Sequence, residues 1–294
     1  MERSKFLPEF KGFISGVVGA WCGVFVGQPF DIIKVRLQNS GGSAILALKN
    51  LLSHEGFLTL WKGSLPPLIG VGLSNAVSFG TNENTKRIVS SYNKPGEILS
   101  LSQHALCGTS AGFFRAFFSC PAELVRIRMQ VQGKIDPRGD PLYKNSIECF
   151  ISIIKTYGIK GIYRGFSATM IRELMGNTLF FGGYQFCGRK IFGGEKLNAD
   201  ELGKLKIMAC GAFAGYCYWA PYCIDVIKSK MQSDSFANPR YKSLLDCLKI
   251  TYKTDGFSGF FKGWTPTMLR AAPACASLFL GFEATMSIFG RNYR

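Results

Sequence analysis

The clearest chemical pattern in this sequence is an acid followed by two bases and a glutamine, and it occurs three times at one spacing. The acid and the first base lie three positions apart, which places both on one face of a helix, one turn apart. Such a pattern predicts a ring of charges, and a solvated ring without a function is the alternative interpretation. The acid–base sets are Asp31 with Lys34, Glu123 with Arg126 and Asp225 with Lys228, and the glutamines are Gln38, Gln130 and Gln232.

A second motif, an aromatic residue followed by a base and a glycine, comes after each charged set. The motif begins five positions after another glycine. An acid precedes that glycine in repeats one and three, whereas Tyr157 precedes it in repeat two. The two motifs together define three units of about 100 residues. The three motifs are Trp61-Lys62-Gly63, Tyr163-Arg164-Gly165 and Phe261-Lys262-Gly263.

Charged residues also occur inside the apolar stretch that follows the second motif, but not in every unit. Seven residues beyond each motif glycine, about 10 Å along a helix, stand Gly70, Arg172 and Arg270. Glu173 follows Arg172, whereas Val71 and Ala271 occupy the equivalent positions. An arginine can hold a carboxylate through two hydrogen bonds, and Glu173 could balance an ammonium group. A purely structural Arg172–Glu173 pair is the alternative.

Further polar residues mark the same stretch. About one turn beyond these positions stand Ser74, Asn75 and Asn177. Arg115 also breaks the threefold pattern, with Gly23 as its counterpart, and its angle from Glu123 places it near the edge of a central cavity. We therefore expect a solute site at these asymmetric positions, because residues alike in all three units serve the scaffold.

The elements that must position these residues follow one order in each unit. An apolar helix ends in the charged set, a short amphipathic helix follows (43–55, 143–157 and 241–255), and a second apolar helix begins at the aromatic motif (64–90, 166–190 and 264–289). Small residues four apart, Gly108 with Gly112 and Gly211 with Gly215, favour close helix contacts. We therefore predict an all-α membrane protein with six transmembrane helices. The single domain 1–294 would consist of repeats 8–97, 98–197 and 198–294.

Composition excludes several other classes of protein. The chain of 294 residues has 35 Lys and Arg against 19 Asp and Glu, a net charge of +16. Its basic residues follow the repeat positions instead of lining one face with interleaved aromatics, which argues against a nucleic-acid binder. No nucleophile elbow, phosphate-binding loop or paired-cysteine motif occurs. We therefore expect neither an enzyme nor a metal site.

These motifs resemble the signature of the mitochondrial carrier family, P-x-[DE]-x-x-[KR]-x-[KR]-x-Q, over nearly the whole chain. The resemblance implies a pseudo-threefold barrel in the mitochondrial inner membrane, with both termini toward the intermembrane space and the amphipathic helices on the matrix side. It implies no cofactor, and cardiolipin is the expected bound lipid at the three aromatic-basic-glycine motifs. Basic residues collect on that side and attract anionic lipid.

By the same resemblance, the charged sets pair between repeats as Asp31–Arg126, Glu123–Lys228 and Asp225–Lys34, and they close a matrix gate braced by the three glutamines. Solvated pairs of this kind are each worth roughly 0–1 kcal/mol, so solute binding could open them. The opposite, cytosolic gate is incomplete, and we expect a resting state open to that side. Of its residues Glu83, Lys86 and Glu283, only Glu283 and Lys86 form a possible pair between helices.

The Arg–Glu pair with an arginine on the sixth helix resembles the branch that carries amino acids, carnitine and acylcarnitines. Carriers of basic amino acids place a glutamate where this chain has Ser74, so a small or zwitterionic amino acid, or a carnitine ester, is expected. The function implied is metabolite exchange by alternating access. The alternative is a structural or assembly subunit of an inner-membrane complex. It is suggested by the incomplete cytosolic gate and by helix five, where Cys223 replaces the usual proline and Pro221 comes earlier.

Overall fold

The protein is described by a computed structural model, which covers residues 3–40, 42–94, 97–132, 142–193 and 204–290. Every regular element in these ranges is a helix. Repeat one contains α1 (Arg3–Ser40), α2 (Ala44–His54) and α3 (Leu65–Ser91). Repeat two contains α4 (Leu101–Val131), α5 (Ser146–Ile162) and α6 (Phe166–Phe186). Repeat three contains α8 (Lys204–Trp219), α9 (Tyr222–Ser233), α10 (Leu244–Asp255) and α11 (Trp264–Gly290).

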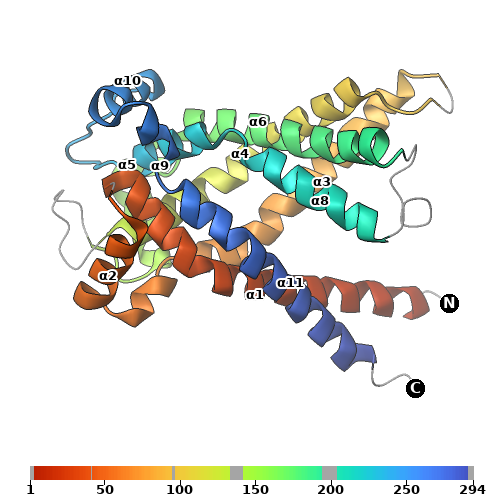
Figure 1. The fold of residues 1–294 in the computed structure, drawn as a ribbon, viewed down its shortest axis with the longest axis horizontal. Coiled ribbons are helices and arrows are strands. Elements are labelled where there is room, and N and C mark those ends of the chain that lie inside the picture. Colours follow the sequence, from red (N-terminus) through yellow and green to blue (C-terminus); the bar gives the residue numbers. More distant parts are fainter. Residues whose placement is uncertain (1–2, 41, 95–96, 133–141, 194–203, 291–294) are drawn as a thin grey trace.

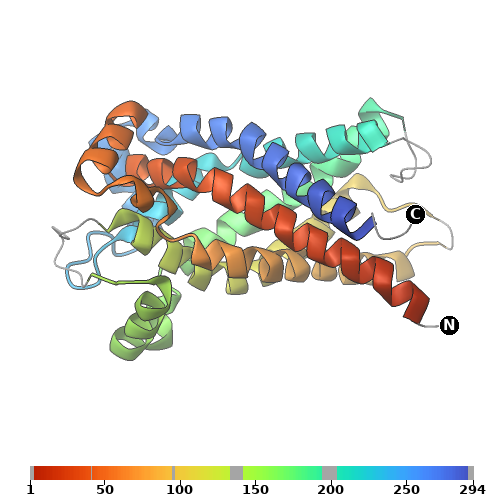
Figure 2. The ribbon, with the colours of Figure 1, turned by 90° about the horizontal axis from the view of Figure 1, so that it is seen from below.

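The order of elements is the expected one, and each repeat contributes its short helix to the same end of the molecule. Helices α2, α5 and α10 gather there, whereas α1 begins and α11 ends at the opposite end (Figures 1 and 2). Six membrane-crossing helices were expected from the sequence. Within the ranges described, no helix is both long enough and apolar enough to cross a membrane.

The glycine of each aromatic-basic-glycine motif forms the tight turn into the following long helix. Gly63, Gly165 and Gly263 have φ angles of 76°, 77° and 84°, a left-handed conformation that other residues rarely adopt. Each glycine also packs closely on the charged helix of the next repeat. A Cβ added at Gly63 would lie 3.1 Å from the carbonyl oxygen of Arg126, and one at Gly263 would lie 2.9 Å from that of Lys34. The motif therefore fixes the charged helices of neighbouring repeats against each other.

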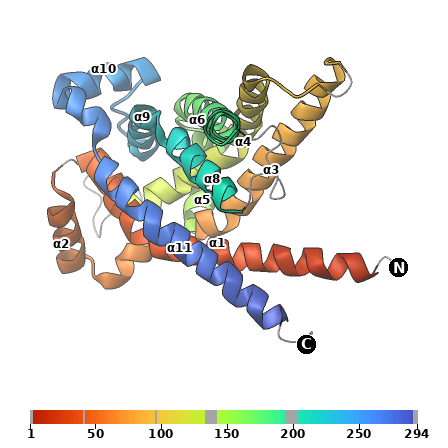
Figure 3. The same cartoon turned by 45° about the vertical axis from the view of Figure 1, so that its right-hand side comes forward.

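Helix α4 is the centre of the packing in repeat two, because it lies against both α3 and α6, while α1 packs along α11 (Figure 3). Gly108 and Gly112 allow α4 to approach α6, as the spacing predicted. A Cβ at Gly112 would lie only 2.3 Å from the carbonyl oxygen of Glu173. The same prediction for Gly211 and Gly215 is wrong for the part of the chain described, because an added Cβ at either glycine would meet no neighbouring atom within 4 Å there.

We expect Gly112→Ala to destabilise the protein by about 1–3 kcal/mol, the usual range for overpacking a tight contact. The added methyl group must push α4 away from α6, since the atom it meets belongs to the backbone. The measurement is the thermal unfolding midpoint of the purified chain in detergent. Gly211→Ala is the matched control, because its methyl group would meet no described neighbouring atom within 4 Å. Equal midpoints for the two variants would contradict this account of the α4–α6 contact.

The first long helix of repeat three departs from its counterparts, as Pro221 and Cys223 suggested. Helices α1 and α4 continue through Pro29 and Pro121, but the third counterpart is broken into α8 and α9. Pro221, with φ −79° and ψ 41°, precedes the first residue of α9. Because proline cannot donate a backbone hydrogen bond, Pro221 favours a helix break at this position. Tyr218 and Trp219 stand immediately before the break.

Candidate functional site

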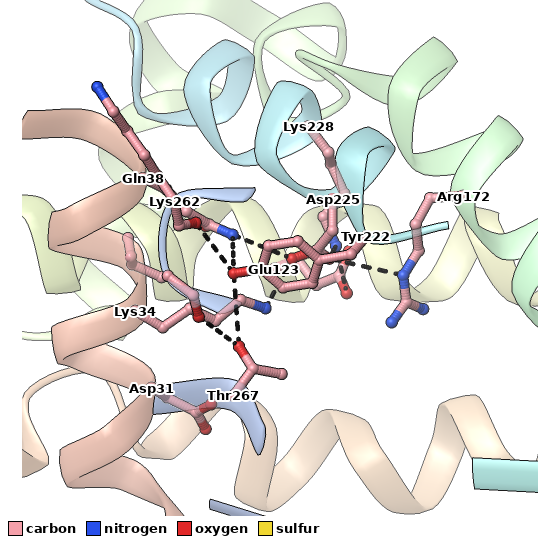
Figure 4. A network of polar contacts seen from close by, with 12 residues as sticks. Asp31, Lys34, Gln38, Glu123, Arg172, Tyr222, Asp225, Lys228, Lys262 and Thr267 are labelled. Atoms are coloured by element: carbon pink, nitrogen blue, oxygen red, sulfur yellow. Dashed lines mark hydrogen bonds and ion pairs between the residues drawn. The ribbon is translucent and has the colours of Figure 1, made fainter. Parts of the chain in front are cut away.

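The structure brings together the three expected ion pairs, which join the repeats in a closed ring. Lys34 Nζ lies 2.6 Å from Asp225 Oδ2, and Lys228 Nζ lies 3.1 Å from Glu123 Oε1. Arg126 forms an ion pair with Asp31. Figure 4 shows Lys34 of α1, Glu123 of α4, and Asp225 and Lys228 of α9 converging.

The three pairs differ strongly in burial, although their motifs are alike. The carboxylate of Asp225 is 6% exposed and also lies 3.4 Å from Lys228 Nζ and 3.6 Å from Arg172 Nε. Glu123 is 26% exposed. The contribution of roughly 0–1 kcal/mol expected for a solvated ion pair therefore does not apply to Asp225. A buried carboxylate has lost its hydration and depends on these partners.

Only one of the expected glutamine braces contacts its ion pair in the part of the chain described. Gln38 donates to the carboxylate of Asp225 at 3.4 Å. Gln232 donates instead to Thr169 at 3.2 Å, and the side-chain amide of Gln130 is buried without a hydrogen-bond partner there. The bracing prediction is therefore wrong for Gln130 and Gln232 in this conformation, because their amides do not reach the ion pairs.

Two residues that the sequence analysis did not identify support the ring instead. Gln28 accepts a hydrogen bond from Arg126 and donates one to the carbonyl oxygen of Lys62. The hydroxyl of Tyr222 accepts from Gln38 at 3.2 Å and donates to the carbonyl oxygen of Lys262 at 3.0 Å (Figure 4). Each of them links the ring to the aromatic-basic-glycine motif of its own repeat. They occupy the same repeat position, where repeat two has Cys120, so no shared residue type marks this position in the threefold pattern.

The aromatic residues of the motifs hold their turns against nearby long helices. Trp61 Nε1 donates to the carbonyl oxygen of Phe25, and the Tyr163 hydroxyl donates to that of Phe117. Phe261 is 45% exposed. Two of the three aromatic groups therefore have a structural hydrogen bond.

The basic residues of the motifs act unequally between repeats. Lys62 reaches the carbonyl oxygen of Gln132 in repeat two at 3.1 Å, and Arg164 reaches Asp234 in repeat three at 2.8 Å. Lys262 instead lies 2.6 Å from Asp255 of its own repeat. Burial opposes the charged form of Asp255, but hydrogen bonds from Lys262 and Lys230 outweigh it and hold the pKa of this carboxyl below its usual value.

Tyr157, which replaces the acid in repeat two, contacts repeat three through an aromatic stack. Its ring stacks on Phe236 with centroids 4.2 Å apart. The guanidinium groups of Arg128 and Arg164 lie 4.0 Å and 4.8 Å from the Phe236 ring. At the equivalent positions of repeat one, Arg36 pairs with Glu55 at 2.6 Å. In repeat two, Tyr157 and Arg128 therefore contact Phe236 of repeat three through aromatic and cation–π interactions, whereas the equivalent residues of repeat one form an ion pair.

The residues of the expected cytosolic gate do not form a described pair between helices. Lys86 contacts Glu83 of its own helix at 3.3 Å, and Glu83 is 57% exposed. The side chain of Glu283 lies outside the described residues.

A polar cavity of about 220 Å³ opens directly beside the ring and shares residues with it. Arg172 and Arg270 line it, together with Ser74 and Arg115. The ring residues on its wall are Asp31, Lys34, Glu123, Arg126, Asp225 and Lys228.

Glu173 lies behind Arg172 in a dense cluster. Arg172 Nη1 is 2.6 Å from Glu173 Oε1, and Arg115 Nε is 3.0 Å from Oε2. Arg172 also stacks over Tyr218, with its Cζ 4.2 Å from the ring centroid, and hydrogen-bonds to that hydroxyl. The ring centroid of Trp219 lies 5.2 Å from Arg172 Cζ and 4.6 Å from Lys34 Nζ.

The remaining predicted polar residues complete this cluster. Asn177 donates to Glu173 Oε2 at 2.9 Å and accepts from Ser78 at 2.8 Å. Asn75 accepts from Arg115 at 2.8 Å. Ser74 is buried at the cavity wall. Sequence reasoning placed Arg115 only at the cavity edge and missed Tyr218 and Trp219, although an aromatic pair beside a helix break was a visible signal.

The two site arginines also reach the gate. Arg270 Nε lies 3.3 Å from Asp31 Oδ2, and Arg172 Nε lies 3.6 Å from Asp225 Oδ1. Gly27 makes room for Arg270, because a Cβ there would lie 2.7 Å from its Nε. Asp31 and Asp225 of the ring are therefore also ion-pair partners of the two cavity arginines.

Comparison with known proteins agrees with this arrangement. The family model described as "Mitochondrial carrier protein" matches residues 7–93, 98–195 and 200–293. The chain is 34% identical to the "Glutamate/glycine mitochondrial carrier ymc1" of Schizosaccharomyces pombe, over 93% of this chain and 92% of the relative. It is 33% identical to a "Mitochondrial carnitine/acylcarnitine carrier-like protein" of Arabidopsis thaliana, over 96% and 99%. It is 34% identical to the "Mitochondrial basic amino acids transporter" of Mus musculus, over 91% and 86%.

These relatives are transporters and not enzymes, and they confirm the resemblance found in the three charged motifs. The chain belongs to the mitochondrial carrier family.

Proposed function

We propose that this protein is an inner-membrane carrier that moves a small solute with a carboxylate and an amine, of the amino-acid class, by alternating access. The observation that carries the proposal is the polar cavity that ends on a closed ring of ion pairs and shares Asp31 and Asp225 with it. Glutamate, glycine, basic amino acids and carnitine, after which the relatives are named, all carry a carboxylate.

The size of the cavity is compatible with a small amino acid. It measures about 220 Å³, below the range of about 300–1,000 Å³ that is usual for pockets of drug-sized ligands. A small zwitterion or small acid matches that volume.

The arginine contacts supply a link between solute and gate. A solute carboxylate that binds Arg270 competes with Asp31 for the same guanidinium group, and one that binds Arg172 competes with Asp225. Solute binding therefore weakens the ion pairs that Arg270 and Arg172 form with two acids of the ring. A ligand shifts a conformational equilibrium only by binding one state better than the other, and this competition provides such a difference.

The proposed orientation places α2, α5 and α10 at the matrix side and both chain ends toward the intermembrane space. It is supported by the gathering of the short helices at one end (Figure 2) and by the basic motif residues close to them. The proposed lipid at these motifs is cardiolipin, whose anionic headgroup suits a cluster of Lys and Arg.

We expect Arg270→Ala to lower the initial rate of solute uptake by roughly 10- to 100-fold, since one hydrogen bond to a charged group is worth about 1.5–3 kcal/mol. The measurement uses the purified chain in liposomes and labelled glycine, glutamate, ornithine and carnitine, each in turn. Arg87→Ala removes the same charge from an exposed position on α3 and serves as the control.

Two outcomes would contradict the proposal. Equal uptake by the two variants would remove Arg270 from the solute site. A folded wild-type chain that moves none of the four solutes, but copurifies stoichiometrically with a larger membrane complex, would favour the structural role suggested by the incomplete cytosolic gate.

A further inference from the structure

Glu173 is not available to the solute in this conformation, although it is the only acid in the asymmetric set. Its side chain is 1% exposed and does not line the cavity. Both carboxylate oxygens are occupied, Oε1 by Arg172 and Oε2 by Arg115 and Asn177. A solute ammonium group would first have to displace a guanidinium group from a buried position, which is costly. The anionic partner of Arg172 and Arg115 is therefore Glu173 itself.

The charge balance around the cavity points to an anionic solute. Three basic residues of the ring and three arginines outside it line the wall: Lys34, Arg126, Lys228, Arg115, Arg172 and Arg270. Three acids of the ring line it as well. Among the described residues, adding the enclosed Glu173 leaves an excess of two positive charges. A like-charge excess in a confined site favours a solute that carries the opposite charge.

Arg115 and Arg270 are the arginines outside the ring that retain exposed surface. Their side chains are 18% and 28% exposed, whereas that of Arg172 is 6% exposed and covered by Tyr218 and Glu173. Arg270 stands on α11 of repeat three and Arg115 on α4 of repeat two, so they approach the cavity from different repeats. Arg115 is fixed in place by Glu173 and Asn75, which orients its guanidinium group before the solute arrives.

We propose that this cavity recognises a small solute with two carboxylates, such as an acidic amino acid, and that Arg115 and Arg270 each hold one of them. This inference rests on the proposed carrier function. It assigns to Arg115 the role of an anchor for the second carboxylate, and it makes Glu173 the residue that positions this anchor. A solute of net charge −1 or −2 then offsets the excess charge of the wall.

The test compares uptake of labelled glutamate and glutamine, which have nearly the same shape but differ in one carboxylate. The wild-type chain in liposomes is expected to take up glutamate about tenfold faster or more. Arg115→Gln is expected to remove this preference by slowing glutamate uptake about tenfold more than it slows glutamine uptake. Lys249→Gln removes the same charge from an exposed position on α10 and should keep the preference.

A double variant separates an anchor from a residue that merely neutralises Glu173. Arg115→Gln with Glu173→Gln removes both charges together and so leaves no unpaired carboxylate. If Arg115 anchors the solute, the double variant still lacks the preference for glutamate. Recovery of the preference in the double variant would overturn the proposal.

Failure of this inference is distinguishable from failure of the carrier function. A wild-type chain that moves glycine, ornithine or carnitine, but takes up glutamate no faster than glutamine, overturns the inference and leaves the carrier function in place. A folded chain that moves none of these solutes overturns both.

Discussion

Replacing Asp225 with asparagine is expected to abolish solute uptake and to lower the free energy of unfolding by about 3–5 kcal/mol, the cost of breaking a buried ion pair from one side. Asp225 faces Lys34, Lys228 and Arg172 within 3.6 Å. Without its charge, the three cations repel one another in a place that water reaches poorly. The measurements are glutamate and glycine uptake in liposomes and unfolding of the purified chain in detergent.

Glu123→Gln provides the matched comparison, because Glu123 occupies the same position in the repeat motif. Its side chain is 26% exposed, and its ion-pair partner among the described residues is Lys228 at 3.1 Å. Because Lys228 keeps Asp225 as a second partner at 3.4 Å, this variant should lose clearly less stability than Asp225→Asn. Equal destabilisation by the two substitutions would mean that sequence symmetry, and not burial, sets the energy of the ring.

Glu173→Gln is expected to have the second large effect, a loss of about 3–5 kcal/mol in unfolding free energy. The amide leaves Arg172 and Arg115 without the carboxylate that both contact. Because the destabilisation comes from unpaired positive charge, adding Arg115→Gln should restore about 1 kcal/mol or more. Unfolding midpoints of the single and double variants in detergent measure both changes.

Glu83→Gln is the control for this prediction. It makes the same chemical change at a side chain that is 57% exposed and contacts only Lys86 among the described residues, so a change below about 1 kcal/mol is expected. A Glu173→Gln variant as stable as Glu83→Gln, or a double variant less stable than the single one, would show that the cluster is not held by charge pairing.

The sequence was sufficient to predict the order of helices and the partners of the ring. The repeated spacing of Asp31, Glu123 and Asp225 shows that each motif places an acid and a base on one helix face, and the resemblance to the mitochondrial carrier family implies which repeats they pair between. The starts of α3, α6 and α11 were also predictable, since Gly63, Gly165 and Gly263 mark the turns that precede them.

The details that depend on packing between repeats were not predictable in the same way. Spacing gives the face of a helix, but it does not say whether another repeat covers that face. Asp225 and Glu123 therefore look equivalent in sequence, although the first is nearly enclosed and the second is partly open. Arg115 was assigned to the cavity edge from its angle alone, whereas its long side chain reaches across to Glu173 on α6.

The enclosure of the Lys34–Asp225 pair has a consequence for the response of the gate to ionic strength. Dissolved salt weakens interactions between charges that face the solvent, over a Debye length of about 8 Å at 0.15 M, but it acts much less on buried pairs. These two side chains are 10% and 6% exposed, so mobile ions reach them poorly. Raising the salt concentration should therefore weaken the attraction of anionic solutes to the strongly basic chain, while the Lys34–Asp225 pair stays closed.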